Sequence, residues 1–278
     1  MARTWPRWAL ALFPLLALSA WAHPKHVFPF GTDASFHPTL SQLQALLGSL
    51  EGADGHLCQL AVDALVSGNW RGEDGWEDPS EKPWTRRWQG GVPGPEAVGV
   101  LGQKLGAAQP CLRRLAATWL GWMEGAEALA RLHAALSVPN PEERQASAFG
   151  LGQRGDASAR PWLEKTLLDG DARVAAAAAW ALGELQDERA VSALVQAAHH
   201  QEARVRRAAV GSLGNYAGPE ALPTLLEALQ DREAAVRRQA AMALAEGDVS
   251  PTVQRALRAA LADVSPEVRR EAAQALGR

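Results

Sequence analysis

A ten-residue pattern recurs through the second half of the chain and constrains its fold more than any other feature. The four clearest copies begin with valine, and successive copies begin 31, 31 and 32 residues apart. They are VAAAAAWALG (174–183), VRRAAVGSLG (205–214), VRRQAAMALA (236–245) and VRREAAQALG (268–277). The same spacing upstream reaches ERQASAFGLG at residue 143 and LRRLAATWLG at residue 112. A fixed period of this length is typical of a repeat architecture.

A second helix is predicted between successive copies. A leucine follows the leucine near the end of each copy by 12 residues, or 13 in the last case, and a small or apolar residue stands four positions later. This i, i+4 spacing puts both side chains on one helical face. The residues at these two positions are Leu132, Leu163, Leu194, Leu225 and Leu257, followed by Leu136, Leu167, Ala198, Leu229 and Leu261. Each unit is too short to bury its own apolar face, so neighbouring units must stack.

Two kinds of helix therefore alternate, which we name the pattern helix (the ten-residue copies) and the companion helix. Pattern helices are expected to begin near residues 57, 112, 143, 174, 205, 236 and 268, and companion helices near 40, 95, 126, 157, 188, 219 and 251, with no sheet. The fifth residue of each copy is small, which allows neighbouring helices to approach closely. These residues are Ala116, Ser147, Ala178, Ala209, Ala240 and Ala272.

Two segments, DREAAVRRQAAMALA and DVSPEVRREAAQALG, follow the pattern D-x-x-x-x-V-R-x-x-A-A-x-A-L-G nearly residue by residue. The chain resembles the HEAT-like repeats of the phycobilisome-lyase type, strongly over residues 95–278 and weakly over 40–66. The resemblance implies an all-α fold, a right-handed α-solenoid of about seven helix pairs with an armadillo-type superhelix. We expect this solenoid to occupy residues 40–278.

In that family a loop acid and an arginine of the pattern helix form a ladder between neighbouring repeats. The resemblance implies this role for Asp231 with Arg237 and for Asp263 with Arg269. A structural role is favoured over nucleic-acid binding, because nucleic-acid faces usually bring a basic excess that this chain lacks. The arginines concerned are Arg113, Arg144, Arg206, Arg237 and Arg269. The ladder should break at Ala175, and loop acids are missing at Ala107, Val138 and His200.

Residues 1–22 have the features of a cleaved signal peptide. Arg3 and Arg7 precede an apolar run, and Ala20-Trp21-Ala22 is a small-x-small cleavage pattern. An uncleaved anchor is the alternative, but the run is shorter than the roughly 20 residues that a spanning helix needs. Cleavage after Ala22 would leave a flexible segment at 23–39, a periplasmic or secreted protein with no membrane span, and a net charge of −5 in place of −3. A net negative charge does not favour nucleic acid as a partner.

An insertion interrupts the first repeats. HLCQLAVDAL (56–65) matches the pattern, but the next companion leucine is Leu101, 36 residues after Leu65 where 12 is normal. The expected loop, residues 67–94, is rich in tryptophan, which is enriched in interface hot spots. The loop could instead fold back and cap the first two repeats. Its tryptophans are Trp70, Trp76, Trp84 and Trp88.

Cys58 and Cys111 lie at the starts of the two pattern helices that flank the insertion. In an exported protein they are expected to form a disulfide across its base, since disulfides persist in oxidising compartments. Closing a loop of about 50 residues would contribute roughly 4 kcal/mol in the chain-entropy treatment. Two buried thiols are the alternative.

No catalytic motif is convincing. GLGQRG (150–155) matches G-x-G-x-x-G, but it follows an alanine-rich helix where a dinucleotide site needs a strand. We therefore expect that the protein is not an enzyme and binds no cofactor. By family analogy, a lyase or isomerase is the alternative. A copper(II) site is a further alternative, because cleavage would leave His23 at the N-terminus with His26 and His37 nearby.

The function that this pattern favours is an exported scaffold that binds a protein or peptide. Companion helices usually line the concave face of such solenoids, and Trp162 is the one large aromatic residue at the positions that flank their core leucines. Arg131 and Lys165 supply charge near it. We expect these three residues to form a recognition surface with the tryptophans of the insertion. Alternatively, Trp162 fills a wide gap between repeats.

Overall fold

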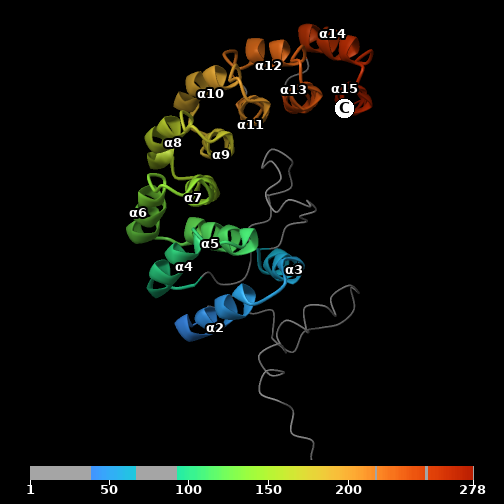
Figure 1. The fold of residues 1–278 in the computed structure, drawn as a ribbon. Coiled ribbons are helices and arrows are strands. Elements are labelled where there is room, and N and C mark those ends of the chain that lie inside the picture. Colours follow the sequence, from blue (N-terminus) through green and yellow to red (C-terminus); the bar gives the residue numbers. More distant parts are fainter. Residues whose placement is uncertain (1–38, 67–92, 217, 248–249, 278) are drawn as a thin grey trace, which may run out of the picture.

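The computed structural model describes residues 39–66, 93–216, 218–247 and 250–277. Within these ranges every regular element is a helix, and the helices follow one another as seven pairs that wind into an open arc (Figure 1). The pattern helices are α3 (Gly55–Val66), α5 (Pro110–Trp122), α7 (Pro141–Arg154), α9 (Ala172–Glu184), α11 (Ala203–Leu213), α13 (Ala234–Glu246) and α15 (Pro266–Leu276). The companion helices are α2 (Leu40–Glu51), α4 (Val98–Lys104), α6 (Ala126–Ala135), α8 (Arg160–Thr166), α10 (Val191–Ala197), α12 (Leu222–Ala228) and α14 (Pro251–Ala260). Short 3-10 turns lead into three of these, namely η2 (Pro95–Ala97), η3 (Ala157–Ala159) and η4 (Glu188–Ala190).

The expected α-solenoid is confirmed, and each pattern helix begins two residues before the expected position. Local chemistry explains the early starts. The side chain of Asn140 accepts the backbone N–H of Glu142 at the start of α7, and Asp171 caps α9 in the same way through Arg173. Such caps satisfy amide groups that have no partner within the helix. Proline, whose fixed φ suits the first turn, begins α5, α7 and α15.

The small residue at the fifth position of each copy is fully buried in all six units from α5 to α15. Close approach between pattern helices depends on glycine as well. A Cβ added to Gly183 would lie 2.6 Å from Cβ of Ser212 on the next pattern helix, and one added to Gly214 would lie 2.8 Å from Cβ of Ala243. Glycine near the end of these helices therefore sets the spacing of the stack.

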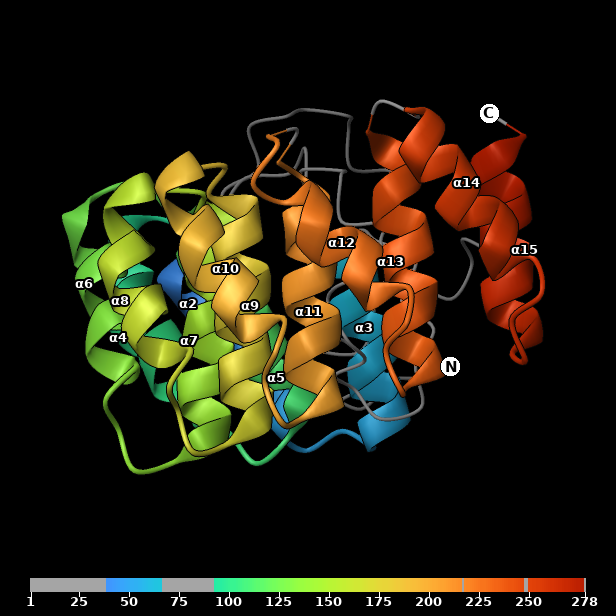
Figure 2. The ribbon, with the colours of Figure 1, turned by 90° about the horizontal axis from the view of Figure 1, so that it is seen from above.

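The pattern helices form the concave side of the arc and the companion helices form its convex side (Figure 1). The expectation that companion helices line the concave face is therefore wrong. Its physical reason lies in the contacts just described, since pattern helices that meet through glycine, alanine and serine approach one another closely. The more closely packed layer becomes the inside of the curve. Figure 2 shows α9, α11, α13 and α15 running side by side in the same direction.

Candidate functional site

The side chains on the concave face can be identified from the helical rotation of each pattern helix. In α11, Val205, Ala209 and Leu213 are fully buried and mark the side that faces the core. Each residue turns an α-helix by about 100°, so residues two and six places after Val205 lie about 200° and 240° around the helix. Arg207 and Gly211 therefore lie on the concave face, as do the residues at matching positions of the other pattern helices.

Arginine occupies the first of these concave positions in three consecutive pattern helices. Arg207 of α11 and Arg238 of α13 are half-buried, and the side chain of Arg270 of α15 is 61% exposed. Because the three helices run side by side, these residues form a row along one edge of the concave face, which we call the arginine row. Met242, four residues after Arg238, supplies a half-buried apolar side chain beside it.

The matching positions in the N-terminal half of the arc have a different character. In α7 and α9 the second concave position carries Phe149 and Trp180, which stack with ring centroids 4.9 Å apart and an interplanar angle of 17°. Both rings are nearly fully buried, and Gln145 and Ala176 at the first concave position are buried too. From α7 to α15, the accessible concave surface is therefore that of α11, α13 and α15.

The arginine that directly precedes each member of the row has a different, structural role. Arg206 of α11 donates from Nε and Nη2 to the two carboxylate oxygens of Asp231, at 2.7 and 2.8 Å. Its Nη1 donates to the backbone oxygens of His200 and Gln201. Since both side chains are about nine-tenths buried, at 7% and 12% exposure, this pair is a structural link between neighbouring repeats.

The same link recurs, so the expected ladder is confirmed, with a corrected pairing. Arg144 pairs with Asp169 and Arg237 with Asp263, each through the acid of the following turn. The expected side-chain pairing of Asp231 with Arg237 is wrong, because the carboxylate of Asp231 binds Arg206 of the preceding repeat. Arg237 contacts Asp231 only at its backbone oxygen. The expected pairing of Asp263 with Arg269 is wrong in the same way: Arg269 donates to the backbone oxygens of Asp263 and Val264.

These pairs hold the aspartates in their charged form. The hydrogen bond from Arg237 lowers the pKa of Asp263, against the opposing effect of burial. Burial acts to raise the pKa of Asp231, but hydrogen bonds from Arg206 and from the backbone N–H of Glu233 outweigh it and leave that pKa below its ordinary value. The ladder therefore depends on ionised carboxylates.

The ladder is interrupted where the sequence lacks its residues. Ala175 and His200 stand at the two positions of the missing pair, between the repeats of α9 and α11. Arg113, whose turn acid would be at Val138, instead lies 3.1 Å from a carboxylate oxygen of Glu142. Burial lowers the pKa of Arg113, while Glu142 acts in the opposite direction.

The recognition residues predicted on the companion helices lie on the convex side. Trp162 of α8 stacks on His133 of α6, with ring centroids 3.8 Å apart and an interplanar angle of 10°. Arg131 donates to the backbone oxygen of Gly102 and lies 3.3 Å from Glu143, and so contacts α4 and α7. Lys165 is exposed. Partner binding by Trp162, Arg131 and Lys165 stays a prediction, and it now concerns the convex surface.

Several predicted features lie outside the described residues. They are the signal peptide with its cleavage site after Ala22, the segment 23–39 up to Pro38, the histidines of the copper alternative, and the tryptophans of the insertion. These side chains are His23, His26, His37, Trp70, Trp76, Trp84 and Trp88.

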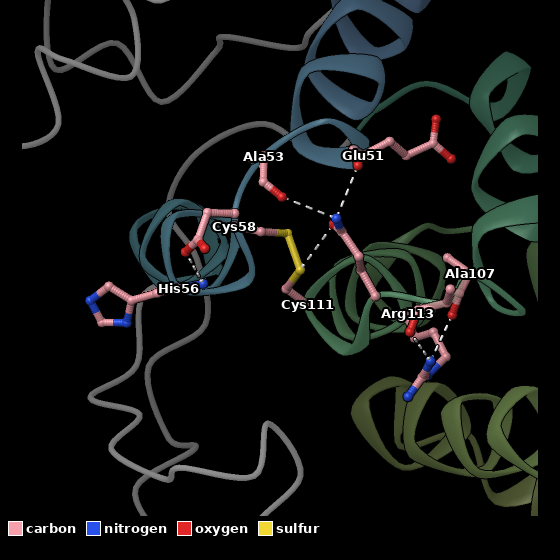
Figure 3. The surroundings of a disulfide bond; sticks show 10 residues. Glu51, Ala53, His56, Cys58, Ala107, Cys111 and Arg113 are labelled. Atoms are coloured by element: carbon pink, nitrogen blue, oxygen red, sulfur yellow. Dashed lines mark hydrogen bonds between the residues drawn. A yellow bond between two sulfur atoms is a disulfide. The ribbon is translucent and has the colours of Figure 1, made fainter.

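The predicted disulfide is confirmed at the base of the insertion (Figure 3). Cys58 of α3 and Cys111 of α5 are bonded, with their Cα atoms 6.1 Å apart, and both side chains are buried. Nearby, Nε2 of Gln109 donates to the backbone oxygens of Glu51 and Ala53, which ties the start of α5 to the turn before α3. The first two pattern helices are therefore linked covalently, and hydrogen bonds tie the second of them to the turn before the first.

A cleft of about 700 Å³ lies between the turns that follow α10 and α12. Its ionisable groups include His199, whose Nδ1 lies 3.8 Å from Oε1 of Glu227, and both side chains are more than half exposed. In the described part of the chain, no three His, Cys, Asp or Glu side chains are grouped so as to hold a metal ion. None of the described helices is long and apolar enough to cross a membrane.

The family resemblance assigned the first arginine of V-R-R to the ladder and gave the second arginine no role. The structure separates them, with the first arginine bound in the ladder and the second on the concave face. The signal that could have identified the arginine row is the 31- or 32-residue recurrence of the second arginine at Arg207, Arg238 and Arg270.

Among solved structures, the first of the following three supports the fold, and the other two are reported as similar. YibA of Escherichia coli is 24% identical with a TM-score of 0.54, over 64% of this chain and 69% of that chain. The complex of CpcE and CpcF of phycocyanin lyase from Nostoc sp. PCC7120 is 28% identical with a TM-score of 0.46, over 53% and 97%. A designed armadillo repeat protein in complex with the peptide (KR)4 is 19% identical with a TM-score of 0.46, over 65% and 98%.

Sequence comparison identifies the family. The chain has no significant match among curated proteins. The sequence profile of HEAT repeats, in contrast, matches residues 98–179, 130–209, 166–245 and 191–277, which together span well over half of the chain. These matches cover the helix pairs from α4 to α15, including the ladder and the arginine row. The chain therefore belongs to the HEAT-repeat family.

Proposed function

We propose that this protein is an exported, non-catalytic scaffold that binds a protein or peptide on the concave face of α11, α13 and α15. The observation that carries the proposal is the accessible concave surface of these helices, on which Arg270 and Gln274 are exposed. A HEAT-repeat scaffold fits a protein-binding role. Repeat solenoids present extended concave surfaces because each repeat adds a small rotation to the stack.

The distribution of ionisable groups favours binding over catalysis. The buried acids Asp231 and Asp263 are each bound by an arginine of the ladder. In the cleft described above, His199 and Glu227 are both exposed and 3.8 Å apart, which does not make a water-excluding site. Lyase or isomerase chemistry, the alternative, rests on family analogy, and a shared fold does not fix a function.

Export is supported by the leader sequence and by the disulfide. The apolar run before Ala22 has the length and flanking charge of a signal peptide. The bond between Cys58 and Cys111 suits an oxidising compartment, because disulfides are rare where thiols are kept reduced. Export is tested by N-terminal sequencing of the protein recovered from the cell envelope, with His23 expected as the first residue.

The tryptophan-rich insertion is proposed as a second contact for the partner. Its four tryptophans can supply large apolar area at low conformational cost. Deleting residues 69–90 is expected to weaken partner binding at least tenfold, equivalent to about 1.4 kcal/mol, while helical circular dichroism is unchanged. Equal affinity of the deletion variant and the parent protein would remove the insertion from the binding site.

Placing a bulky side chain on each face tests whether the partner binds on the concave face. Gln274 is exposed on the concave side of α15, at the position that matches Met242, and Ala259 is exposed on α14 of the convex side. A partner captured with the processed full chain from an envelope extract is purified, and its affinity is measured for Gln274→Trp and Ala259→Trp. We expect at least tenfold weakening for Gln274→Trp alone. Weakening by Ala259→Trp alone would instead place the partner on the convex face.

A further inference from the structure

We propose that the cleft between the turns after α10 and α12 binds the indole ring of a tryptophan in a partner segment. This inference goes beyond the proposed function, because it concerns the turns that join companion helices to pattern helices and not the concave face. The cleft has a volume of about 700 Å³, within the usual range of ligand sites in proteins. It therefore has room for a large aromatic side chain and part of the segment that carries it.

The repeat register explains why this cleft is open. Two repeats of 31 residues separate Thr224 of α12 from Trp162 of α8, so both residues occupy the same place on their companion helices. The indole of Trp162 stacks on His133 of α6, the preceding companion helix. Thr224 lines the cleft, and its side chain is too small to cover α10 in the same way. The chain thus places an indole of its own at the position that is open beside α12.

The lining of the cleft combines apolar surface with an unpaired hydroxyl group. Ala198 and Ala228 supply the apolar part, and each is 8% exposed. The side chain of Thr224 is also more than nine-tenths buried, and its hydroxyl forms no hydrogen bond with any described residue. A hydroxyl group both donates and accepts hydrogen bonds. Thr224 can therefore bind a backbone amide of the segment that carries the ring.

Glu227 and His199 are placed to bind the ring itself. Both line the cleft with side chains more than half exposed, and Nδ1 of His199 lies 3.8 Å from Oε1 of Glu227. The indole N–H only donates, and it usually finds an acceptor when the ring is buried. The carboxylate of Glu227 is such an acceptor. The imidazole of His199 offers a flat surface for stacking, as His133 does for Trp162.

The charges of the lining favour a neutral ligand. Its four charged side chains are two arginines and two acids, namely Arg206, Arg232, Glu227 and Asp231. Arg206 and Asp231 are bound to each other in the ladder, so neither charge is free to select a charged ligand. The ladder link also fixes this wall of the cleft, and a preorganised site loses less entropy on binding.

The test uses fluorine-labelled N-acetyl-tryptophanamide, a neutral probe that presents the ring between two amide groups as a peptide does. Fluorine NMR measures its affinity for the full, disulfide-bonded chain and for three variants. Thr224→Trp places a ring at the cleft in the way that α8 does, and Glu227→Ala removes the acceptor. Ala259→Trp, on the exposed surface of α14, is the matched control for an added ring. Labelled free tryptophan, which carries two charges, is titrated in parallel.

We expect Ala259→Trp to bind the probe as the parent protein does, Thr224→Trp to weaken binding at least tenfold, and Glu227→Ala at least threefold. Free tryptophan should bind at least fivefold more weakly than the probe. The inference would be overturned if the parent protein did not bind the probe, if folded Thr224→Trp bound it as well as the parent, or if free tryptophan bound more tightly.

Glu227→Ala changes an exposed side chain, so it decides the question even if Thr224→Trp does not fold. Affinity equal to that of the parent protein would then refute the proposed role of the cleft. The experiment with Gln274→Trp uses the captured partner and therefore tests the concave face separately.

Discussion

Replacing Asp231 by asparagine should destabilise the solenoid, because the change removes one link of the ladder and keeps the shape of the side chain. Arg206 binds both carboxylate oxygens of Asp231, and the two side chains are 7% and 12% exposed. One oxygen also accepts the backbone N–H of Glu233 at 2.8 Å. Asparagine keeps one acceptor and loses the negative charge, so Arg206 is left mostly buried without a counter-ion.

The magnitude follows from these contacts. A hydrogen bond to a charged group contributes about 1.5 to 3 kcal/mol, and at least one of the two that Arg206 makes to the carboxylate is lost. Removing one partner of a fully buried ion pair costs about 3 to 5 kcal/mol, which sets an upper limit for this partly exposed pair. We therefore expect Asp231→Asn to lower the free energy of unfolding by about 2 to 3 kcal/mol.

Urea unfolding at neutral pH, followed by far-ultraviolet circular dichroism, measures this difference. Glu227→Gln is the matched control, because Glu227 is 69% exposed and lies 3.8 Å from His199 in a similar pairing between repeats. Its expected cost is below about 0.5 kcal/mol, as for exposed ion pairs in general. If Asp231→Asn cost no more than Glu227→Gln, the ladder would not stabilise the stack and this reasoning would be refuted.

Four further outcomes are expected, each measured by urea unfolding or, for the glycine pair, by melting temperature. Ala175→Arg with His200→Asp should restore the missing link and add about 1 kcal/mol beyond the sum of the single changes, a coupling that is absent if the repeats cannot reach each other. Gly183→Ala should lower the melting temperature through overpacking, whereas Gly99→Ala, with open space at its Cβ, should raise it slightly; equal effects would contradict the helix spacing. Reducing the disulfide should cost up to about 4 kcal/mol, and no change would mean that it does not constrain the unfolded chain. The folded-state pKa of Asp263 is lowered, so its stabilisation is present above the unfolded value of about 3.9 and is lost as pH falls through the folded pKa. Asp263→Asn should therefore weaken the loss of stability in acid, and an unchanged acid profile would contradict this.

The helices and their stacking could be predicted because they follow from local periodicity. The recurrence of a small residue at the fifth position of each copy predicted a buried column, and Ala178, Ala209 and Ala240 are indeed fully buried. The two cysteines that flank the insertion predicted the disulfide for a similar reason, since both lie near the starts of consecutive pattern helices. Such features depend on sequence spacing alone.

The curvature and the exact ladder pairs depend on three-dimensional distances that spacing does not contain. Which layer becomes concave is decided by how closely each kind of helix packs, and Gly183 against Ser212 illustrates the close contact of pattern helices. Asp231 is near Arg237 in sequence, but the side chain of Arg206 reaches it across the repeat boundary. Because the curvature was predicted wrongly, the companion-helix surface was expected on the concave side of the arc, whereas it lies on the convex side.

The most direct test of the central claim, that a partner binds on the concave face, is site-specific photo-crosslinking. A photoreactive amino acid is placed at Met242 of α13, on the concave side, or at Ala259 of α14, on the convex side, and each variant is irradiated in the cell envelope. We predict one discrete protein adduct from Met242 and none from Ala259. An adduct that forms from Ala259 and is missing from Met242 would contradict the claim.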